Sequence, residues 1–212
     1  MRMTSAFWVL EGMDGCGKTT QAELLVAALA AEGRNPLHLR EPGSTGLGEG
    51  LRAMLLDSQR EDWDPRSEAL LFFAARNQLL HEEVAPALAA GRDVVCERFT
   101  PSTLAYQGQT PELRQWVLEL DRLVVSKAQR PQCVFILDLA AEVSFARVGG
   151  SAGEAGHDSF EARGLPFQQR VRAGYLAYAD AFPESSEVIP VAGKSIEAIA
   201  SEILTLSKAL RS

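Results

Sequence analysis

A glycine-rich stretch near the start of the chain constrains its fold more than any other feature. The stretch, Gly12-Met13-Asp14-Gly15-Cys16-Gly17-Lys18-Thr19, fits the phosphate-loop pattern G-x-x-x-x-G-K-[ST] at every fixed position. An apolar run precedes it, and apolar residues at helical spacing follow it up to Gly33. In a strand, loop and helix of this kind, backbone N–H groups converge on phosphate oxygens at a helix N-terminus. The stretch predicts a nucleoside triphosphate site, with Lys18 at the terminal phosphates and the Thr19 hydroxyl on Mg²⁺.

The composition of the 212-residue chain narrows the partners to be expected. Hydrophobic residues make up 46% of it, enough for one core, so we expect a single domain over residues 1–212. A net charge of −7 disfavours a nucleic-acid partner, because such a partner needs a basic face. A nucleotide ligand remains compatible with this charge, since a few arginines and Mg²⁺ neutralise phosphates locally.

Cysteine usage and hydropathy bear on where the protein works. Cys16, Cys96 and Cys133 are odd in number and irregularly spaced, which is typical of reduced thiols and not of a disulfide framework or a metal site. No stretch reaches 18 apolar residues, and no signal peptide is visible. We therefore expect a cytoplasmic protein with no membrane partner.

Strand and helix patterns alternate along the whole chain. The expected strands are 6–11, 36–40, 92–96, 132–138 and 187–191, and the expected helices are 18–32, 47–57, 66–89, 111–128, 140–148, 161–181 and 195–209. This alternation predicts an α/β fold, a parallel sheet covered by helices on both faces. Ligands of such sheets bind at the carboxyl ends of the strands.

One low-complexity stretch, 149–156, contains too many glycines for the interior of a helix or strand. It predicts a mobile loop. In a phosphoryl-transfer enzyme such a loop is a candidate lid that excludes water, and the alternative is a flexible surface linker.

Two charged groups follow predicted strands. Arg40-Glu41-Pro42-Gly43 comes after the second strand, and Glu97-Arg98 after the third. Glu97 offers the hard oxygen that Mg²⁺ prefers, and Arg98 offers a planar fork of donors for a phosphate. The alternatives are an ordinary loop with solvated charges and a surface ion pair worth under about 1 kcal/mol.

A long helix and a polar turn together suggest a base pocket. Phe72 and Arg76 lie four residues apart and share a helix face, so a ring and a guanidinium could stack on a base and bond its carbonyl edge. The commoner meaning of such residues is a core phenylalanine and a solvated arginine. The residues that could read a base edge and pack against a sugar are Ser102, Thr103, Tyr106 and Gln107.

Taken together, these stretches resemble the thymidylate kinase family of P-loop nucleoside monophosphate kinases. The matching segments are 11–20, 40–43, 71–76 and 97–108, and 194–198 also looks similar. Many families share the phosphate loop, whereas the other three segments in this order are specific. The resemblance implies a three-layer P-loop kinase fold with a five-stranded parallel sheet and a lid at about 149–162. It also implies Mg²⁺-dependent transfer from ATP to dTMP, yielding dTDP for dTTP synthesis, and a homodimer.

The resemblance further implies a role for each matching residue. ATP would bind Gly12, Met13, Asp14, Gly15, Cys16, Gly17, Lys18, Thr19 and Thr20, with Arg147 near adenine. Thymine would stack on Phe72, bond Arg76 through O4, meet Thr103, Ser102 and Gln107 at its N3 edge, and place its methyl group by Pro42. Tyr106 would lie under the deoxyribose, Asp14 and Glu41 near the sugar and the acceptor phosphate, and Arg98 on that phosphate. The implied catalytic residues are Lys18, Arg98, Asp14, Glu97 and Arg163, and the implied metal ligands are Thr19 and Glu97.

The chain departs from the family pattern in two places. The family usually has Asp where this chain has Glu97, which changes how the carboxylate reaches Mg²⁺. Family members also carry a catalytic arginine in the phosphate loop or in the lid sequence Asp-Arg-x-Glu, but this chain reads Asp158-Ser159-Phe160-Glu161. Such an arginine contributes about 10³–10⁵ in rate. We expect Arg163 or Arg147 to replace it, with Arg170 as a further candidate.

Three other functions compete with this reading. A kinase for a different nucleotide or nucleoside is disfavoured by segment 97–108. A GTP-dependent switch protein would need an Asn-Lys-x-Asp motif, which the chain lacks. A nucleotide-binding protein without catalysis is suggested by the missing lid arginine, and turnover separates it from an enzyme.

Overall fold

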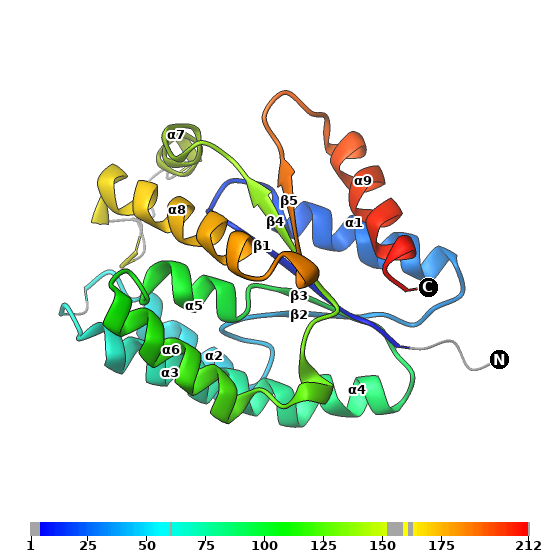
Figure 1. The fold of residues 1–212 in the computed structure, drawn as a ribbon, viewed down its shortest axis with the longest axis horizontal. Coiled ribbons are helices and arrows are strands. Elements are labelled where there is room, and N and C mark those ends of the chain that lie inside the picture. Colours follow the sequence, from blue (N-terminus) through cyan, green and yellow to red (C-terminus); the bar gives the residue numbers. More distant parts are fainter. Residues whose placement is uncertain (1–4, 60, 152–158, 161–162, 212) are drawn as a thin grey trace.

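A five-stranded parallel sheet forms the centre of the structure, a computed structural model that describes residues 5–59, 61–151, 159–160 and 163–211. The strands are β1 (Phe7–Gly12), β2 (Leu37–Arg40), β3 (Val94–Glu97), β4 (Cys133–Asp138) and β5 (Ser186–Pro190). Their order across the sheet is β2-β3-β1-β4-β5 (Figure 1). The predicted parallel α/β sheet is therefore confirmed, with each strand boundary within two residues of its expected position.

Helices connect the strands. They are α1 (Lys18–Ala31), α2 (Gly46–Leu56), α3 (Pro65–Leu79), α4 (Ala85–Ala89), α5 (Thr100–Tyr106), α6 (Pro111–Val124), α7 (Ala141–Ser151), α8 (Leu165–Ala181) and α9 (Ile196–Ala209). A π-helical segment spans Leu80–Val84, and short 3₁₀ segments span Lys127–Gln129 and Pro183–Ser185. Side-chain oxygens of Thr45, Asp64, Thr110 and Ser195 accept N–H groups at the starts of α2, α3, α6 and α9. These caps satisfy donors that a helix cannot pair internally.

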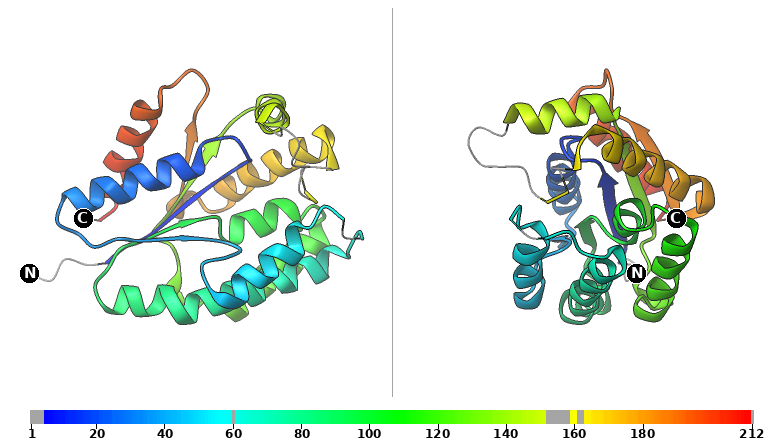
Figure 2. Two further views of the ribbon diagram at one scale, coloured as in Figure 1. Left: turned by 180° about the vertical axis from the view of Figure 1, so that it is seen from behind. Right: turned by 90° about the vertical axis from the view of Figure 1, so that its left-hand side faces the viewer.

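Helices cover both faces of the sheet because the strands carry apolar side chains on both faces. In β1, Phe7 and Val9 join one core cluster, while Trp8 and Leu10 join another. The Trp8 side packs against α1 and α9, and the Phe7 side packs against α3, α5 and α8. Figure 1 and Figure 2 show α1 and α9 on one side of the sheet and the larger group of helices on the other. A third cluster joins α3, α5 and α6 outside that second layer.

Some expected boundaries of helices and loops need correction, and one is the helix expected at 111–128, which ends at Val124. The expected helix 66–89 is continuous in extent, but the π-helical turn at Leu80–Val84 interrupts it. Pro86 explains this position, because proline lacks the N–H that an α-helical turn would use and its ring crowds the preceding turn. Residues 149–151 were expected in a loop but belong to α7, which continues to Ser151. Of the predicted lid 149–162, residues 152–158 and 161–162 lie outside the described part of the chain.

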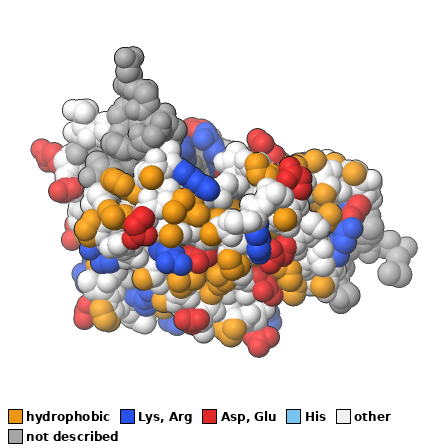
Figure 3. Space-filling model, turned by 90° about the horizontal axis from the view of Figure 1, so that it is seen from above, with side chains coloured by type: hydrophobic (Ala, Val, Ile, Leu, Met, Phe, Trp, Pro, Cys, Tyr) orange, Lys and Arg blue, Asp and Glu red, His pale blue; other side chains and the backbone are white. Residues whose placement is uncertain are grey.

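The described helices include none with both the length and the apolar character needed to cross a membrane. Figure 3 looks onto the face that is uppermost in Figure 1. Acidic and basic side chains are interspersed there, so the net charge of −7 is not gathered on that face.

One close helix contact supports the part of the fold that carries the site. Gly174 in α8 faces Ala105 in α5, and a Cβ atom built on Gly174 would lie 2.8 Å from the Ala105 Cα. Real Cβ contacts do not come this close, so the two backbones approach each other only because residue 174 has no side chain. Gly50 in α2 offers a contrast, because a Cβ there would meet nothing within 4 Å.

We predict that Gly174→Ala lowers the free energy of unfolding by about 1 kcal/mol or more, even though alanine favours helix by about 1 kcal/mol. The control Gly50→Ala should leave stability unchanged or raise it by about 0.5–1 kcal/mol. Urea denaturation of the two variants and the wild type measures both changes. Equal effects of the two substitutions would contradict the proposed close packing of α5 on α8.

Candidate active site

The predicted phosphate loop joins β1 to α1. Gly17, with φ of 98°, immediately precedes α1 and has no side chain to accept the first N–H groups of that helix. By contrast, Thr45 and Thr110 cap α2 and α6 with their hydroxyls. The uncapped N–H groups and the positive end of the helix dipole thus make this end of α1 suited to an anion.

A cleft of about 850 Å³ opens above the loop. It is lined by the loop and helix residues Asp14, Gly15, Gly17, Lys18, Thr19 and Thr20, and by Arg40, Glu41, Arg52, Glu97 and Arg98 from the neighbouring strands and α2. The other predicted ATP-binding residues lie differently. Gly12, Met13 and Cys16 are buried within the loop, and Arg147 reaches the loop from α7.

The expected metal ligands face each other in this cleft. The Thr19 hydroxyl donates to Glu97 Oε2 over 2.6 Å, and His38 Nε2 lies 3.1 Å from Glu97 Oε1. Burial would raise the pKa of Glu97, but the hydrogen bonds from His38 and Thr19 outweigh it and lower that pKa.

This hydroxyl and carboxylate suit Mg²⁺, which takes few protein ligands beside phosphates and water. The described residues contain no group of three or more His, Cys, Asp and Glu side chains placed to hold a metal. A metal held here would therefore take its remaining ligands from a nucleotide and from water.

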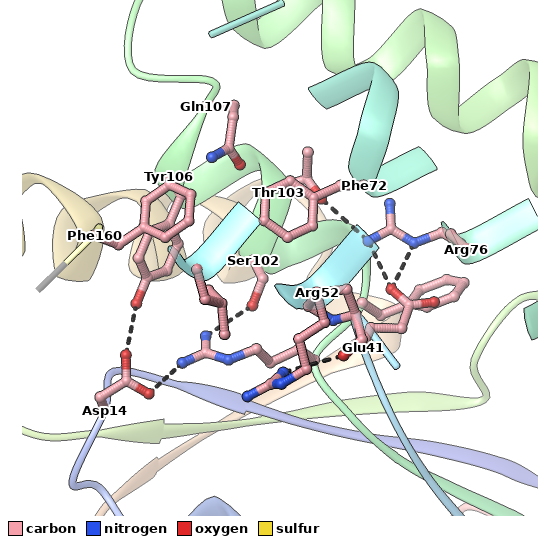
Figure 4. A pocket seen from close by; sticks show the side chains of 14 residues that line it. Asp14, Glu41, Arg52, Phe72, Arg76, Ser102, Thr103, Tyr106, Gln107 and Phe160 are labelled. Atoms are coloured by element: carbon pink, nitrogen blue, oxygen red, sulfur yellow. Dashed lines mark hydrogen bonds and ion pairs between the residues drawn. The ribbon is translucent and has the colours of Figure 1, made fainter. Parts of the chain in front are cut away.

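A second cleft, of about 570 Å³, lies beside the first. The structure brings all ten predicted dTMP-binding residues to its lining: Asp14, Glu41, Pro42, Phe72, Arg76, Arg98, Ser102, Thr103, Tyr106 and Gln107. In Figure 4, Asp14 lies at the lower left, while Gln107, Thr103 and Arg76 lie toward the top and right. Four of the described residues line both clefts, namely Asp14, Glu41, Arg52 and Arg98. We call the first the loop cleft and the second the acceptor cleft.

Arg98 stands where the two clefts meet. Its guanidinium donates to Asp14 Oδ1 over 2.5 Å, to the Tyr175 hydroxyl over 2.9 Å and to Ser102 Oγ over 3.1 Å. Its backbone has φ of 68°, which is uncommon for a residue other than glycine. The Arg98 side chain is thus fixed by partners from the phosphate loop, α5 and α8, and the residue lines both clefts.

The charges at this junction favour an ionised Asp14. Burial would raise the pKa of Asp14, but the positive charges of Arg98 and Lys18 outweigh it and hold that pKa well below its usual value. Lys18 Nζ lies 3.5 Å from Asp14 Oδ1 and donates to the Met13 carbonyl over 2.9 Å. The Tyr106 hydroxyl also donates to Asp14, over 3.3 Å.

A buried arginine forms the deep wall of the acceptor cleft. Arg76 donates from Nε to Glu41 Oε2 over 2.8 Å and from Nη2 to Thr103 Oγ1 over 3.1 Å, as the dashed lines in Figure 4 show. Its guanidinium lies between the rings of Phe73 and Phe99, at 4.5 and 4.8 Å from their centres. Among the described residues, none bonds Arg76 Nη1 or Glu41 Oε1, and both atoms are buried. Such atoms are costly to leave unpaired, which points to a polar ligand.

Sequence reasoning missed several residues of the site. Arg52 of α2 lines both clefts and donates from Nη1 to the Pro42 carbonyl over 3.1 Å. Tyr175 holds Arg98, and the apolar lining of the acceptor cleft includes Leu56 and Phe160. The spacing of Arg52 within a short amphipathic helix gave no sign that it faces the sheet edge.

The candidates for the missing lid arginine occupy different places. Arg147 Nη1 donates to the Gly15 carbonyl over 2.9 Å, so it lies against the phosphate loop. Arg163 is instead paired with Glu68, with 2.6 Å between Nη2 and Oε1, and lines neither cleft. Arg170 bonds Gln109. The position expected for Arg163, at the transferring phosphoryl group, is not the one it occupies here.

Comparisons with known proteins agree with this geometry. A family model described as thymidylate kinase matches residues 10–203. A thymidylate kinase of Jannaschia sp. is 40% identical over 96% of both chains, and one of Dinoroseobacter shibae is 43% identical over 84% of this chain and 85% of that protein. The crystal structure of a thymidylate kinase from Ehrlichia chaffeensis superposes with a TM-score of 0.76 at 29% identity, over 96% of this chain and 98% of that one.

The burial of Glu41 makes the stability of the fold depend on pH. Burial raises the pKa of Glu41 from its ordinary 4.5 to about 7, although Arg76 opposes this. The folded chain therefore keeps a proton that the unfolded chain releases, so the stability that this carboxyl contributes is present below about pH 4.5 and is lost as the pH rises through about 7.

We predict that the free energy of unfolding of the wild type, measured relative to Glu41→Gln, falls by roughly 1–3 kcal/mol between pH 4.5 and pH 8. Urea denaturation at four pH values within that range provides the measurement. Parallel pH profiles for the two proteins would show that Glu41 titrates normally.

Proposed function

Since the chain belongs to the thymidylate kinase family, we propose that it transfers the terminal phosphoryl group of ATP to dTMP and yields ADP and dTDP for dTTP synthesis. The observation that carries this proposal is the meeting of the loop cleft and the acceptor cleft at Asp14, Glu41, Arg52 and Arg98. A donor on the phosphate loop and an acceptor in the other cleft would bring their phosphates together there. In-line phosphoryl transfer depends on this kind of positioning.

The reaction asks little covalent chemistry of the protein. An oxygen of the dTMP phosphate attacks the terminal phosphorus of ATP, and the bond to the bridging oxygen breaks, so that ADP leaves with that electron pair. The attacking oxygen is already anionic and needs no general base. Lys18 and Arg98 stabilise the negative charge on the transferring group, and Asp14 keeps both cations oriented.

The metal that this chemistry uses would be held by the Thr19 hydroxyl, with Glu97 in direct contact or through water. When bound, Mg²⁺ neutralises charge on the phosphate oxygens of ATP. Glu97 is already oriented by His38 and Thr19, so its carboxylate needs little rearrangement to take that role.

The acceptor cleft favours thymine by its shape and its polar atoms. Phe72 offers a ring face, Arg76 Nη1 is a donor for O4, and Pro42 and Leu56 add apolar surface for the 5-methyl group. Tyr106 packs against Phe160 with 5.6 Å between ring centres, which narrows the cleft where a sugar would lie. These features support a deoxyribonucleotide with a methylated pyrimidine base.

We predict that ADP release with ATP and Mg²⁺ is fastest with dTMP in a panel of dTMP, dUMP, dGMP, AMP, CMP, UMP and thymidine. One methyl group in an apolar pocket corresponds to about 10- to 200-fold, so dTMP should exceed dUMP in kcat/KM by that range. Broad turnover across the panel would contradict the base-reading role of the acceptor cleft. Binding of ATP and dTMP without turnover would favour a nucleotide-binding protein that lacks catalysis.

Arg147 is the better placed of the candidates for the missing lid arginine, because it contacts the phosphate loop while Arg163 is paired elsewhere. We predict that Arg147→Ala lowers kcat at least tens-fold and changes the KM for ATP little. Steady-state kinetics measure both constants. The control Arg172→Ala removes an arginine that pairs with Asp138 and lines neither cleft, so its kcat should stay within about threefold. Equal kcat values for Arg147→Ala and the wild type would exclude Arg147.

We also propose a homodimer and a cytoplasmic location. Apolar side chains that are about half exposed, Leu47 and Met54 on α2 and Leu70 on α3, offer surface for a second copy, and the mass in solution tests this. A cytoplasmic location follows from the substrates, because nucleotides of this kind are made and used there, and cell fractionation tests it.

A further inference from the structure

A buried carboxylate behind the acceptor cleft links three separate segments of the chain. Glu68 of α3 is fully buried. Its Oε1 accepts from Arg163 Nη2 over 2.6 Å, and its Oε2 accepts from Gln107 Nε2 over 2.9 Å. Arg163 comes just before α8, and Gln107 comes just after α5. A buried charge requires such partners, so one reading of this group is purely structural.

The chemistry of the pair fixes how Gln107 is oriented. An ionised carboxylate has no hydrogen to donate, so the Gln107 atom that faces Glu68 must be the NH₂ group. The carbonyl oxygen Oε1 then points away from Glu68. Gln107 lines the acceptor cleft and is almost fully buried, and no described residue donates to its Oε1. A buried carbonyl is costly to leave unpaired, which indicates a donor on the ligand.

A second unpaired atom, of the opposite kind, belongs to another residue that lines the same cleft. Arg76 Nη1 is a buried donor that no described residue accepts. One acceptor and one donor match the edge of thymine, where N3–H donates and O4 accepts. Cytosine presents the reverse pattern, an accepting N3 and a donating amino group. Uracil presents the same pattern as thymine.

We propose that Glu68 and Arg163 are positioning residues that hold the Gln107 carbonyl toward N3–H of the base and so favour thymine over cytosine. This inference rests on the proposed function, because it assumes that dTMP binds in the acceptor cleft. Arg163 supplies the charge opposite Glu68, and its guanidinium lies over the rings of Phe160 and Phe167, at 4.8 and 5.1 Å from their centres. These contacts fix the arginine and, through Glu68, the amide.

The test measures kcat and KM for dTMP, dUMP and dCMP at saturating ATP. Glu68→Gln removes the acceptor-only character, because a glutamine at position 68 can turn either end of its amide toward Gln107. We expect the preference for dTMP over dCMP to fall at least about tenfold, mainly through a higher KM for dTMP, with kcat at saturating dTMP within about threefold. The ratio of dTMP to dUMP should not change, since the two bases share this edge.

Variants of the arginine keep the test decisive if Glu68→Gln folds poorly. Arg163→Met should shift the preference in the same direction, and Arg163→Lys, which keeps the charge, should restore it in part. A loss of kcat in Arg163→Met with unchanged base preference would overturn the proposal and place Arg163 in phosphoryl transfer. An unchanged preference together with a lower Tm would also overturn it and leave the group with a structural role alone.

A matched control separates base reading from stability. Asp93 is as buried as Glu68 and pairs with Arg34 and Arg211, but it lies just before β3, at the opposite end of the sheet from the clefts. Asp93→Asn should lower Tm and leave base preference unchanged. A wild-type protein that does not use dTMP would refute the proposed function itself, whereas a wild type that prefers dTMP and variants that keep this preference would refute only the present inference.

Discussion

The site depends on the fixed position of Arg98, which has partners in the phosphate loop, α5 and α8. Its left-handed backbone conformation costs on the order of 1–3 kcal/mol and turns the side chain toward the loop, where Asp14 and the Tyr175 hydroxyl hold it. The surrounding contacts offset that cost in advance of any ligand. A guanidinium held this way needs no rearrangement when phosphates approach, and such preorganised charge is the largest single contribution in most sites of this kind.

Glu11 connects the end of β1, beside the loop cleft, to α5, which lines the acceptor cleft. This buried carboxylate, the penultimate residue of β1, accepts the N–H groups of Phe99 and Ser102 over 2.7 and 3.1 Å, and so holds the start of α5. Burial raises the pKa of Glu11, although Arg98 opposes the change. The phosphate loop begins one residue later, and Thr103 and Tyr106 of α5 line the acceptor cleft. Glu11 therefore ties the start of α5 to the end of β1, next to the phosphate loop.

The parallel sheet and the phosphate loop could be predicted from local patterns in the sequence. The ten residues of the acceptor cleft were predicted only through the resemblance to the thymidylate kinase family, since their local patterns alone also fit core and solvated residues. Arg52 and Tyr175 could not be predicted in this way, because Arg52 reaches the clefts through the packing of α2 on α3, and Tyr175 reaches Arg98 through the packing of α8 on α5. The continuation of α7 through a pair of glycines to Ser151 was also hidden, since the glycine-rich composition there predicts a loop. Arg76 shows the limit of the commoner reading, because an arginine expected in solvent is almost completely buried.

The ion pair of Arg163 with the buried Glu68 disfavours this residue as the replacement for the missing lid arginine. An arginine at the transferring phosphoryl group lowers the activation free energy by roughly 4–7 kcal/mol. Moving Arg163 there would take its guanidinium away from the fully buried Glu68, and breaking a buried ion pair costs about 3–5 kcal/mol. Most of the catalytic gain would be lost to that cost. Moving an arginine toward the phosphates costs less free energy when its present partner is more exposed. Arg147 meets that condition, because it is bonded to a backbone carbonyl of the phosphate loop itself.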